Sequence, residues 1–145
     1  MYPFQVVTCI LCVLAVQPAA WAEKSGASTA AISKILIGSW RSEANVRFTR
    51  TFAADGSVTD RMEANEADTT KAQWRLFTDK DRDGALEKVM PGVTYLRVDN
   101  GTDVIFFEIV KADRRRLYLR YADRRGLLLR FTRVINIAEG VAKGK

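Results

Sequence analysis

Histidine is absent from this 145-residue chain, and its two cysteines, Cys9 and Cys12, both lie near the start. Residues 13–145 therefore contain neither a thiol nor an imidazole. That absence excludes, from this part of the chain, cysteine nucleophiles, Ser-His-Asp triads, histidine acid/base catalysis and nearly all zinc, copper and haem ligation. It also excludes disulfides, so stability must come from packing and strand pairing.

The chain also lacks an apolar run of about 18 residues, the length that a membrane-spanning helix needs. The shorter apolar stretch from Val6 to Val16 is followed by Ala20-Trp21-Ala22, the small-x-small pattern that signal peptidase accepts. We therefore interpret residues 1–22 as a cleavable signal peptide and expect a secreted or periplasmic mature chain that begins at Glu23 and has no transmembrane domain. An uncleaved anchor is the alternative, because the first five residues contain no Lys or Arg.

Removal of this leader leaves about 120 residues, the size of one ordinary domain. The apolar fraction of 48% and the charged fraction of 28% are typical of a globular protein. We expect a tether and short helix over 23–35, one domain over 36–134 and a flexible tail over 135–145. The pattern of Ala30 to Leu36 predicts two turns of helix with Ile32, Ile35 and Leu36 on one side, which we interpret as a short lid or plug.

After Gly38 the hydrophobic pattern changes from helical to alternating, which predicts strands. Val46, Phe48 and Phe52 fall on one face of an extended run that ends at Asp55-Gly56, a strong hairpin signal. With the two strands that flank Arg47, the expected strands number eight or nine. The others are predicted near 57–62, 73–77, 86–89, 93–98, 104–110, 116–121 and 127–134.

These strands are separated by turn signals, including Pro91-Gly92, Asn100-Gly101 and an acidic loop over 63–70. An antiparallel meander of this length cannot leave wide sheet edges open. The predicted fold class is therefore all-β: an antiparallel eight- to nine-stranded up-and-down barrel with a short N-terminal helix.

Two distant segments carry a family resemblance. Gly38-Ser39-Trp40 at the first strand, together with Arg133 at the end of the last, resembles the lipocalin-like members of the calycin group. The segment from Phe52 to Gly56 also looks like a Phe-x-x-Asp-Gly turn of short bacterial lipocalin-like domains. In that family the tryptophan plugs one end of an eight-stranded barrel, and the arginine lies across its ring and pairs with backbone carbonyls. The resemblance therefore implies structural roles for Gly38, Trp40 and Arg133.

The interior of a small eight-stranded barrel is either filled by side chains or able to hold one small ligand. Both alternatives remain open for the large residues that we expect to face inward. A preformed cavity would make this chain a binding protein for a small apolar or amphipathic molecule, which is the leading hypothesis. The candidate cavity residues are Phe48, Phe52, Trp74, Leu76, Tyr95, Phe107, Leu119 and Tyr121.

Positive charge is concentrated near the C-terminus. The segment from Lys111 to Arg133 contains nine basic and two acidic residues, a net charge of +7, whereas the rest of the chain has a net charge of −1. One interpretation is an interaction or inhibitor module that docks on an anionic surface or an acidic protein. The other is that these arginines protect sheet edges and keep the protein soluble. Export argues against nucleic acid as the partner. The residues of this predicted arginine face are Arg114, Arg115, Arg116, Arg120, Arg124 and Arg125.

No catalytic or metal site is predicted. The segment from Asp79 to Gly84 matches the opening of a calcium loop, but its twelfth position is Met90, so a solvated β-turn is favoured over a weak calcium-binding turn. Carboxylate pairs such as Asp60 with Glu63 are expected in a solvated loop, and no nucleophile-base pair can be named. We therefore expect no enzyme activity, no catalytic residues, no metal and no cofactor.

Overall fold

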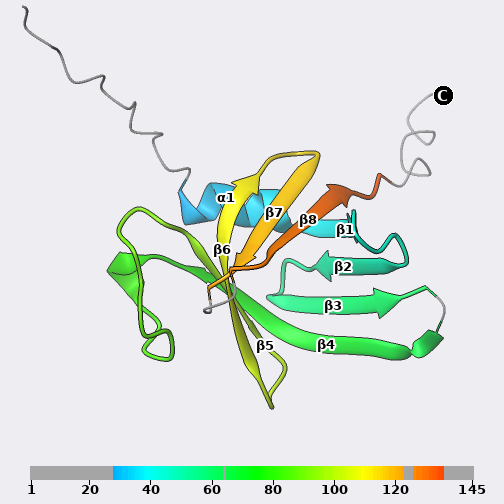
Figure 1. Cartoon of the computed structure of the whole chain (residues 1–145), viewed down its shortest axis with the longest axis horizontal. Helices are drawn as coiled ribbons and strands as arrows, with labels where there is room; N and C mark the ends of the chain where they lie inside the picture. Colours follow the sequence, from blue (N-terminus) through cyan, green and yellow to red (C-terminus); the bar gives the residue numbers. More distant parts are fainter. Residues whose placement is uncertain (1–27, 64, 123–125, 136–145) are drawn as a thin grey trace, which may run out of the picture.

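The computed structural model describes residues 28–63, 65–122 and 126–135, except for the side chains of residues 65–68. The predicted signal peptide with Cys9 and Cys12, and residues 136–145 of the predicted tail, lie outside this range. Within it, eight antiparallel strands form a closed barrel in sequence order, and β8 returns to pair with β1 (Figure 1). This confirms the predicted fold class, and the architecture is compatible with a calycin-like barrel.

The elements follow one another with one helix before the barrel and one 3-10 turn within it. They are α1 (Thr29–Leu36), β1 (Gly38–Ser42), β2 (Phe48–Phe52), β3 (Ser57–Met62), β4 (Asn65–Phe77), η1 (Asp79–Asp81), β5 (Tyr95–Asp99), β6 (Val104–Ala112), β7 (Arg116–Tyr121) and β8 (Leu128–Arg133).

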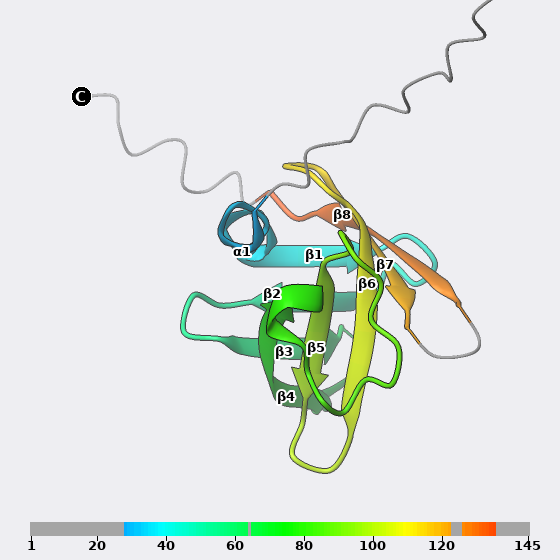
Figure 2. The ribbon, with the colours of Figure 1, turned by 90° about the vertical axis from the view of Figure 1, so that its left-hand side faces the viewer.

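Helix α1 belongs to the core although it lies outside the sheet. The Oγ atom of Ser28 accepts a hydrogen bond from the Ala31 N–H at 3.2 Å, which caps the N-terminus of the helix. Ile32 and Leu36 are buried and join the hydrophobic core of the barrel. Figure 2 shows α1 end-on, next to β1. Among the described residues, no helix has the length and apolar character that crossing a bilayer requires.

The up-and-down topology gives the barrel two ends. The α1 end contains α1, the β2–β3 and β6–β7 turns and the long 78–94 connection. The far end contains the β1–β2, β3–β4, β5–β6 and β7–β8 turns. Since side chains alternate across a strand, every second residue faces the interior. The buried inward-facing residues of the strands are Trp40, Phe52, Val58, Leu96, Val98, Phe107, Leu117, Leu119 and Phe131.

Three predictions about strands are wrong. Residues 86–89 are not a strand but part of the 78–94 connection, where the Leu86 N–H donates to the Asp83 carbonyl in a turn. The predicted acidic loop over 63–70 is a strand from Asn65 onward, because β3 supplies its backbone with hydrogen-bonding partners whatever the polarity of its side chains. Val46 is 65% exposed in the turn before β2 and does not share the face of Phe48.

Candidate functional site

The α1 end of the barrel is closed by Trp40 and Arg133. The Arg133 guanidinium lies over the Trp40 ring, with Cζ 4.7 Å from the ring centroid, and it donates to the carbonyls of Ile35 at 2.6 Å and Ile37 at 2.7 Å. Trp40 Nε1 donates to the Leu36 carbonyl at 2.7 Å. The last strand, the first strand and α1 are thereby tied together.

Gly38 makes room for this arrangement. Its φ angle is +124°, a backbone conformation that residues with a side chain rarely adopt. A Cβ atom at this position would lie 2.8 Å from Nη2 of Arg133. Gly38, Trp40 and Arg133 therefore close this end of the barrel. Nε1 of Trp40 and both Nη atoms of Arg133 are occupied by hydrogen bonds to backbone carbonyls.

All the candidate cavity residues except Tyr95 belong to one hydrophobic core cluster, either as buried members or packed against it. At the α1 end, Phe52 packs edge-on against Trp74 with ring centroids 5.4 Å apart. Trp74 and Leu76 line an outer groove of roughly 380 Å³ beside α1. Leu119 is fully buried in the core. The remaining inward residues, Phe48, Phe107 and Tyr121, lie toward the far end.

Tyr95 is on the wrong face for a cavity residue. Leu96 and Val98, its neighbours along β5, are the residues that enter the core, so the alternation of side chains turns Tyr95 outward. It is nevertheless only 1% exposed, because it stacks on Phe77 under the 78–94 connection. Its hydroxyl accepts a hydrogen bond from the Met90 N–H at 3.0 Å. The alternation along β5 places Tyr95 on the face of Arg97 and Asp99, which could have shown that it points outward, but the sequence did not reveal the segment that covers it.

An ion pair lies among the inward residues midway along β2 and β3, where Arg50 is opposite Trp40 of β1. Arg50 alternates with Phe48 and Phe52 on the inner face of β2 and is only 6% exposed. Its Nε and Nη2 atoms donate to the two carboxylate oxygens of Asp60 on β3 at 2.7 and 2.6 Å. The prediction that Asp60 lies in a solvated loop is wrong, since it is cross-strand partner to Arg50. The period-two pattern that placed Phe48 and Phe52 inside also placed Arg50 there.

Aromatic rings surround the guanidinium. Its Cζ atom lies 5.9 Å from the centroid of Phe48 and 5.5 Å from that of Phe107. Phe107 in turn packs against Tyr121 with centroids 4.7 Å apart. We call Phe48, Arg50, Asp60, Phe107 and Tyr121 the far-end cluster. The Asp60 side chain is 25% exposed, so solvent reaches the cluster.

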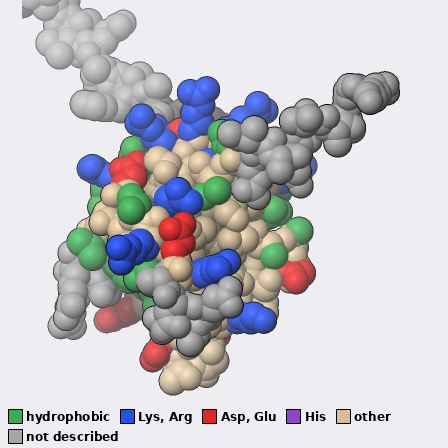
Figure 3. Space-filling view, turned by 90° about the vertical axis from the view of Figure 1, so that its right-hand side faces the viewer, with side chains coloured by type: hydrophobic (Ala, Val, Ile, Leu, Met, Phe, Trp, Pro, Cys, Tyr) green, Lys and Arg blue, Asp and Glu red, His purple; other side chains and the backbone are tan. Residues whose placement is uncertain are grey.

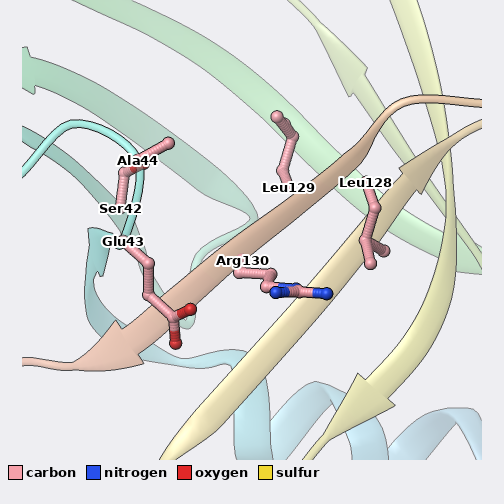
Figure 4. Close-up of a pocket in the computed structure, with 6 residues that line it drawn as sticks. All are labelled: Ser42, Glu43, Ala44, Leu128, Leu129 and Arg130. Carbon is pink, nitrogen blue, oxygen red and sulfur yellow. The ribbon is translucent and has the colours of Figure 1, made fainter.

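A groove lies at the rim of the far end, along the seam where β8 meets β1. It has a volume of roughly 360 Å³, and Figure 4 shows the residues around it. Leu129 projects from the opposite side of β8 to Arg130 and packs against the core. The groove therefore borders both an inward-facing and an outward-facing side chain. Its lining residues are Ser42, Glu43, Ala44, Leu128, Leu129 and Arg130.

The predicted arginine face is exposed where the structure describes it. Arg114, Arg115, Arg116 and Arg120 are all exposed, and Arg120 pairs with Glu108 at 3.3 Å. Arg124 and Arg125 lie outside the described residues.

On the outer face of β7, the Tyr118 ring has two basic neighbours. Nζ of Lys111 lies 5.6 Å, and Cζ of Arg130 5.7 Å, from the ring centroid. Figure 3 shows the side of the molecule that contains the β1–β2 turn, where basic side chains are interspersed with acidic ones. Basic and acidic side chains are thus mixed on this side of the molecule, and two basic groups flank Tyr118.

The carboxylates of the segment from Asp79 to Gly84, which resembles the opening of a calcium loop, bind neighbouring side chains and backbone groups. The carboxylate of Asp83 forms ion pairs with Arg75 and with Arg97, which lie opposite each other on β4 and β5. Asp81 accepts hydrogen bonds from the Thr78 N–H and hydroxyl, which lower the pKa of its carboxyl. In the part of the chain that the structure describes, no group of three or more Cys, His, Asp or Glu side chains is placed to hold a metal ion.

Comparisons of this chain with protein-family models, curated proteins and solved structures found no match. The case for a function therefore rests on the far-end cluster, the rim groove and the basic surface.

Proposed function

We propose that this chain is an exported binding protein, without enzyme activity, which takes up a small apolar or amphipathic molecule at the far end of its barrel. The observation that supports this most is the far-end cluster, in which an ion pair and three aromatic rings share the inner face of the barrel. The α1 end is closed by Trp40, which is fully buried, and by Arg133. Toward the far end, the inward side chains of Phe48, Asp60 and Tyr121 are only partly buried.

Partly exposed inward residues are suited to a ligand. Aromatic rings such as Phe48 and Tyr121 present apolar surface whose removal from water contributes roughly 25 cal/mol per Å². The ion pair between Arg50 and Asp60 adds polar groups to that surface. Binding pockets typically combine mostly apolar walls with a few placed polar groups, as this cluster does.

The first test is the native mass spectrum of the protein purified gently from the cell that produces it. We expect extra mass in the native spectrum that disappears on denaturation, together with a polypeptide mass that begins at Glu23. Bare protein in both spectra would contradict ligand binding. A polypeptide mass that still includes residues 1–22 would contradict cleavage of the signal peptide.

A matched pair of variants locates the ligand. Leu129→Glu places a charge on the inward side of the rim groove, and we expect it to abolish the extra mass, because burying an unpaired carboxylate beside an apolar ligand is unfavourable. Leu127→Glu makes the same chemical change at a residue that is 58% exposed, and we expect it to leave the extra mass in place. Equal loss in both variants would contradict a site at the far end.

A second candidate function is docking on an anionic partner, and the surroundings of Tyr118 favour it. A half-buried aromatic ring between two cations, with Arg116 and Arg120 on the same face, offers both stacking and charge. We expect Arg116→Glu with Arg130→Glu to abolish binding to vesicles that contain anionic phospholipid, and added salt to weaken binding of the unchanged protein. Lys80→Glu with Lys88→Glu changes the net charge equally on the 78–94 connection and is the control. Equal effects of the two pairs would leave only nonspecific charge attraction.

A further inference from the structure

The guanidinium of Arg50 has one buried nitrogen, Nη1, that makes no hydrogen bond to the described residues. Nε and Nη2 donate to the carboxylate of Asp60. Nη1 is buried, and the described residues give it no hydrogen-bond acceptor. Buried polar groups in native structures are nearly always paired, and an unpaired donor carries the full cost of its desolvation. The position of Nη1 is therefore suited to an acceptor that a ligand supplies.

We propose that Nη1 of Arg50 binds the head group of the ligand and that this head group is an uncharged acceptor, such as a ketone, ester or amide carbonyl. This inference rests on the proposed function, because it assigns the chemistry of the same far-end site. A site of this kind would bind neutral molecules with one carbonyl on an apolar body more tightly than either hydrocarbons or carboxylates.

The preference for an uncharged head group follows from Asp60. Its carboxylate already neutralises the guanidinium through two hydrogen bonds, so the pair as a whole carries no net charge. A ligand carboxylate at Nη1 would leave one uncompensated negative charge in a largely desolvated place. A carbonyl oxygen would satisfy the donor without adding charge.

The aromatic rings around the guanidinium also disfavour a charged head group. Phe48 and Phe107 direct ring faces toward the guanidinium, with its Cζ within 6 Å of both centroids. The face of an aromatic ring is negative, so it attracts the cation and repels an anion placed beside it. The same rings, with Tyr121 behind Phe107, provide the apolar surface for the body of the ligand.

The test uses three probes with the same ring system and different head groups: 2-acetylnaphthalene, 2-ethylnaphthalene and 2-naphthoate. Each is titrated into the folded protein, and binding is followed by NMR through the Nε–Hε signal of Arg50 and the backbone amides of β2 and β3. We expect the ketone to bind about tenfold more tightly than the ethyl compound, as one hydrogen bond to a charged donor allows. We expect the carboxylate to bind more weakly than the ketone.

Two variants separate contact with the ligand from a structural role. In Asp60→Asn the guanidinium loses its counter-charge but keeps an oxygen acceptor, so 2-naphthoate should gain about tenfold in affinity while the ketone changes little. In the double variant Arg50→Met with Asp60→Leu, apolar groups replace the whole pair, an exchange that buried ion pairs often tolerate. There the ketone and the ethyl compound should bind equally.

The outcomes distinguish this inference from the proposed function. Equal affinities for the ketone and the ethyl compound in the unchanged protein, with shifts at the far end, would overturn the head-group assignment, leave a water molecule as the partner of Nη1, and keep the binding site. An unchanged affinity for 2-naphthoate in Asp60→Asn would also overturn the assignment. If none of the three probes shifts a signal from the far-end cluster, both the assignment and the proposed site are wrong.

Discussion

At the scale of single residues, Trp40 connects the helix to the barrel. Its ring is fully buried beneath Arg133, and its Nε1 atom satisfies the carbonyl of Leu36 at the C-terminal end of α1. We expect Trp40→Ala to lower the free energy of unfolding by about 3–5 kcal/mol, through the lost transfer energy of the ring and the cavity that it leaves. Urea denaturation followed by circular dichroism measures this loss.

Two further variants show why the loss occurs. Trp40→Phe retains most of the apolar volume but leaves the Leu36 carbonyl without its donor, so its cost should be intermediate, at about 1–3 kcal/mol. Met90→Ala truncates a side chain that is half exposed and should cost less than about 0.5 kcal/mol. A loss below about 1 kcal/mol in Trp40→Ala would show that the ring does not hold this end closed.

At the scale of elements, local patterns predicted most of the barrel. The helix that ends at Leu36, the Asp55-Gly56 hairpin and the strands that became β3, β5, β6, β7 and β8 all follow from hydrophobic period and turn residues. The first residues of β4 could not be predicted this way. They are polar, and they are extended because their backbone pairs with β3.

The candidate site was harder to predict than the strands, because it depends on what covers each face. Tyr95 resembles an inward residue in the sequence, but the 78–94 connection buries it on the outside. Arg50 resembles a surface residue because arginine is rarely buried without a partner. Its partner, Asp60, becomes evident only when β2 and β3 are placed in register. The alternation along β2 was the one sequence signal that could have revealed the pair.

At the scale of the whole molecule, three turns at the α1 end of the barrel depend on ionised aspartates. Hydrogen bonds from the Ser57 hydroxyl and N–H lower the pKa of Asp55, and those from the N–H groups of Arg115 and Arg116 lower the pKa of Asp113. Asp81 is held ionised in the same way at Thr78. In each case the pKa in the folded state lies below the ordinary value of 3.8. Their contribution to stability is therefore fully present above that value and is lost as the pH falls toward the folded-state pKa.

We therefore expect the urea midpoint to be nearly constant between about pH 5 and 7 and to fall steadily below about pH 4. The net charge of +6 at pH 7 also rises as carboxylates are protonated, so self-repulsion adds to the loss. Salt separates the two causes, because about 0.5 M NaCl screens the repulsion and leaves the hydrogen bonds of the turns little affected. Asp113→Asn keeps an oxygen acceptor but cannot titrate, so its midpoint should fall less steeply with acid than that of the unchanged protein. Parallel slopes for the two proteins would show that Asp113 does not couple proton binding to unfolding.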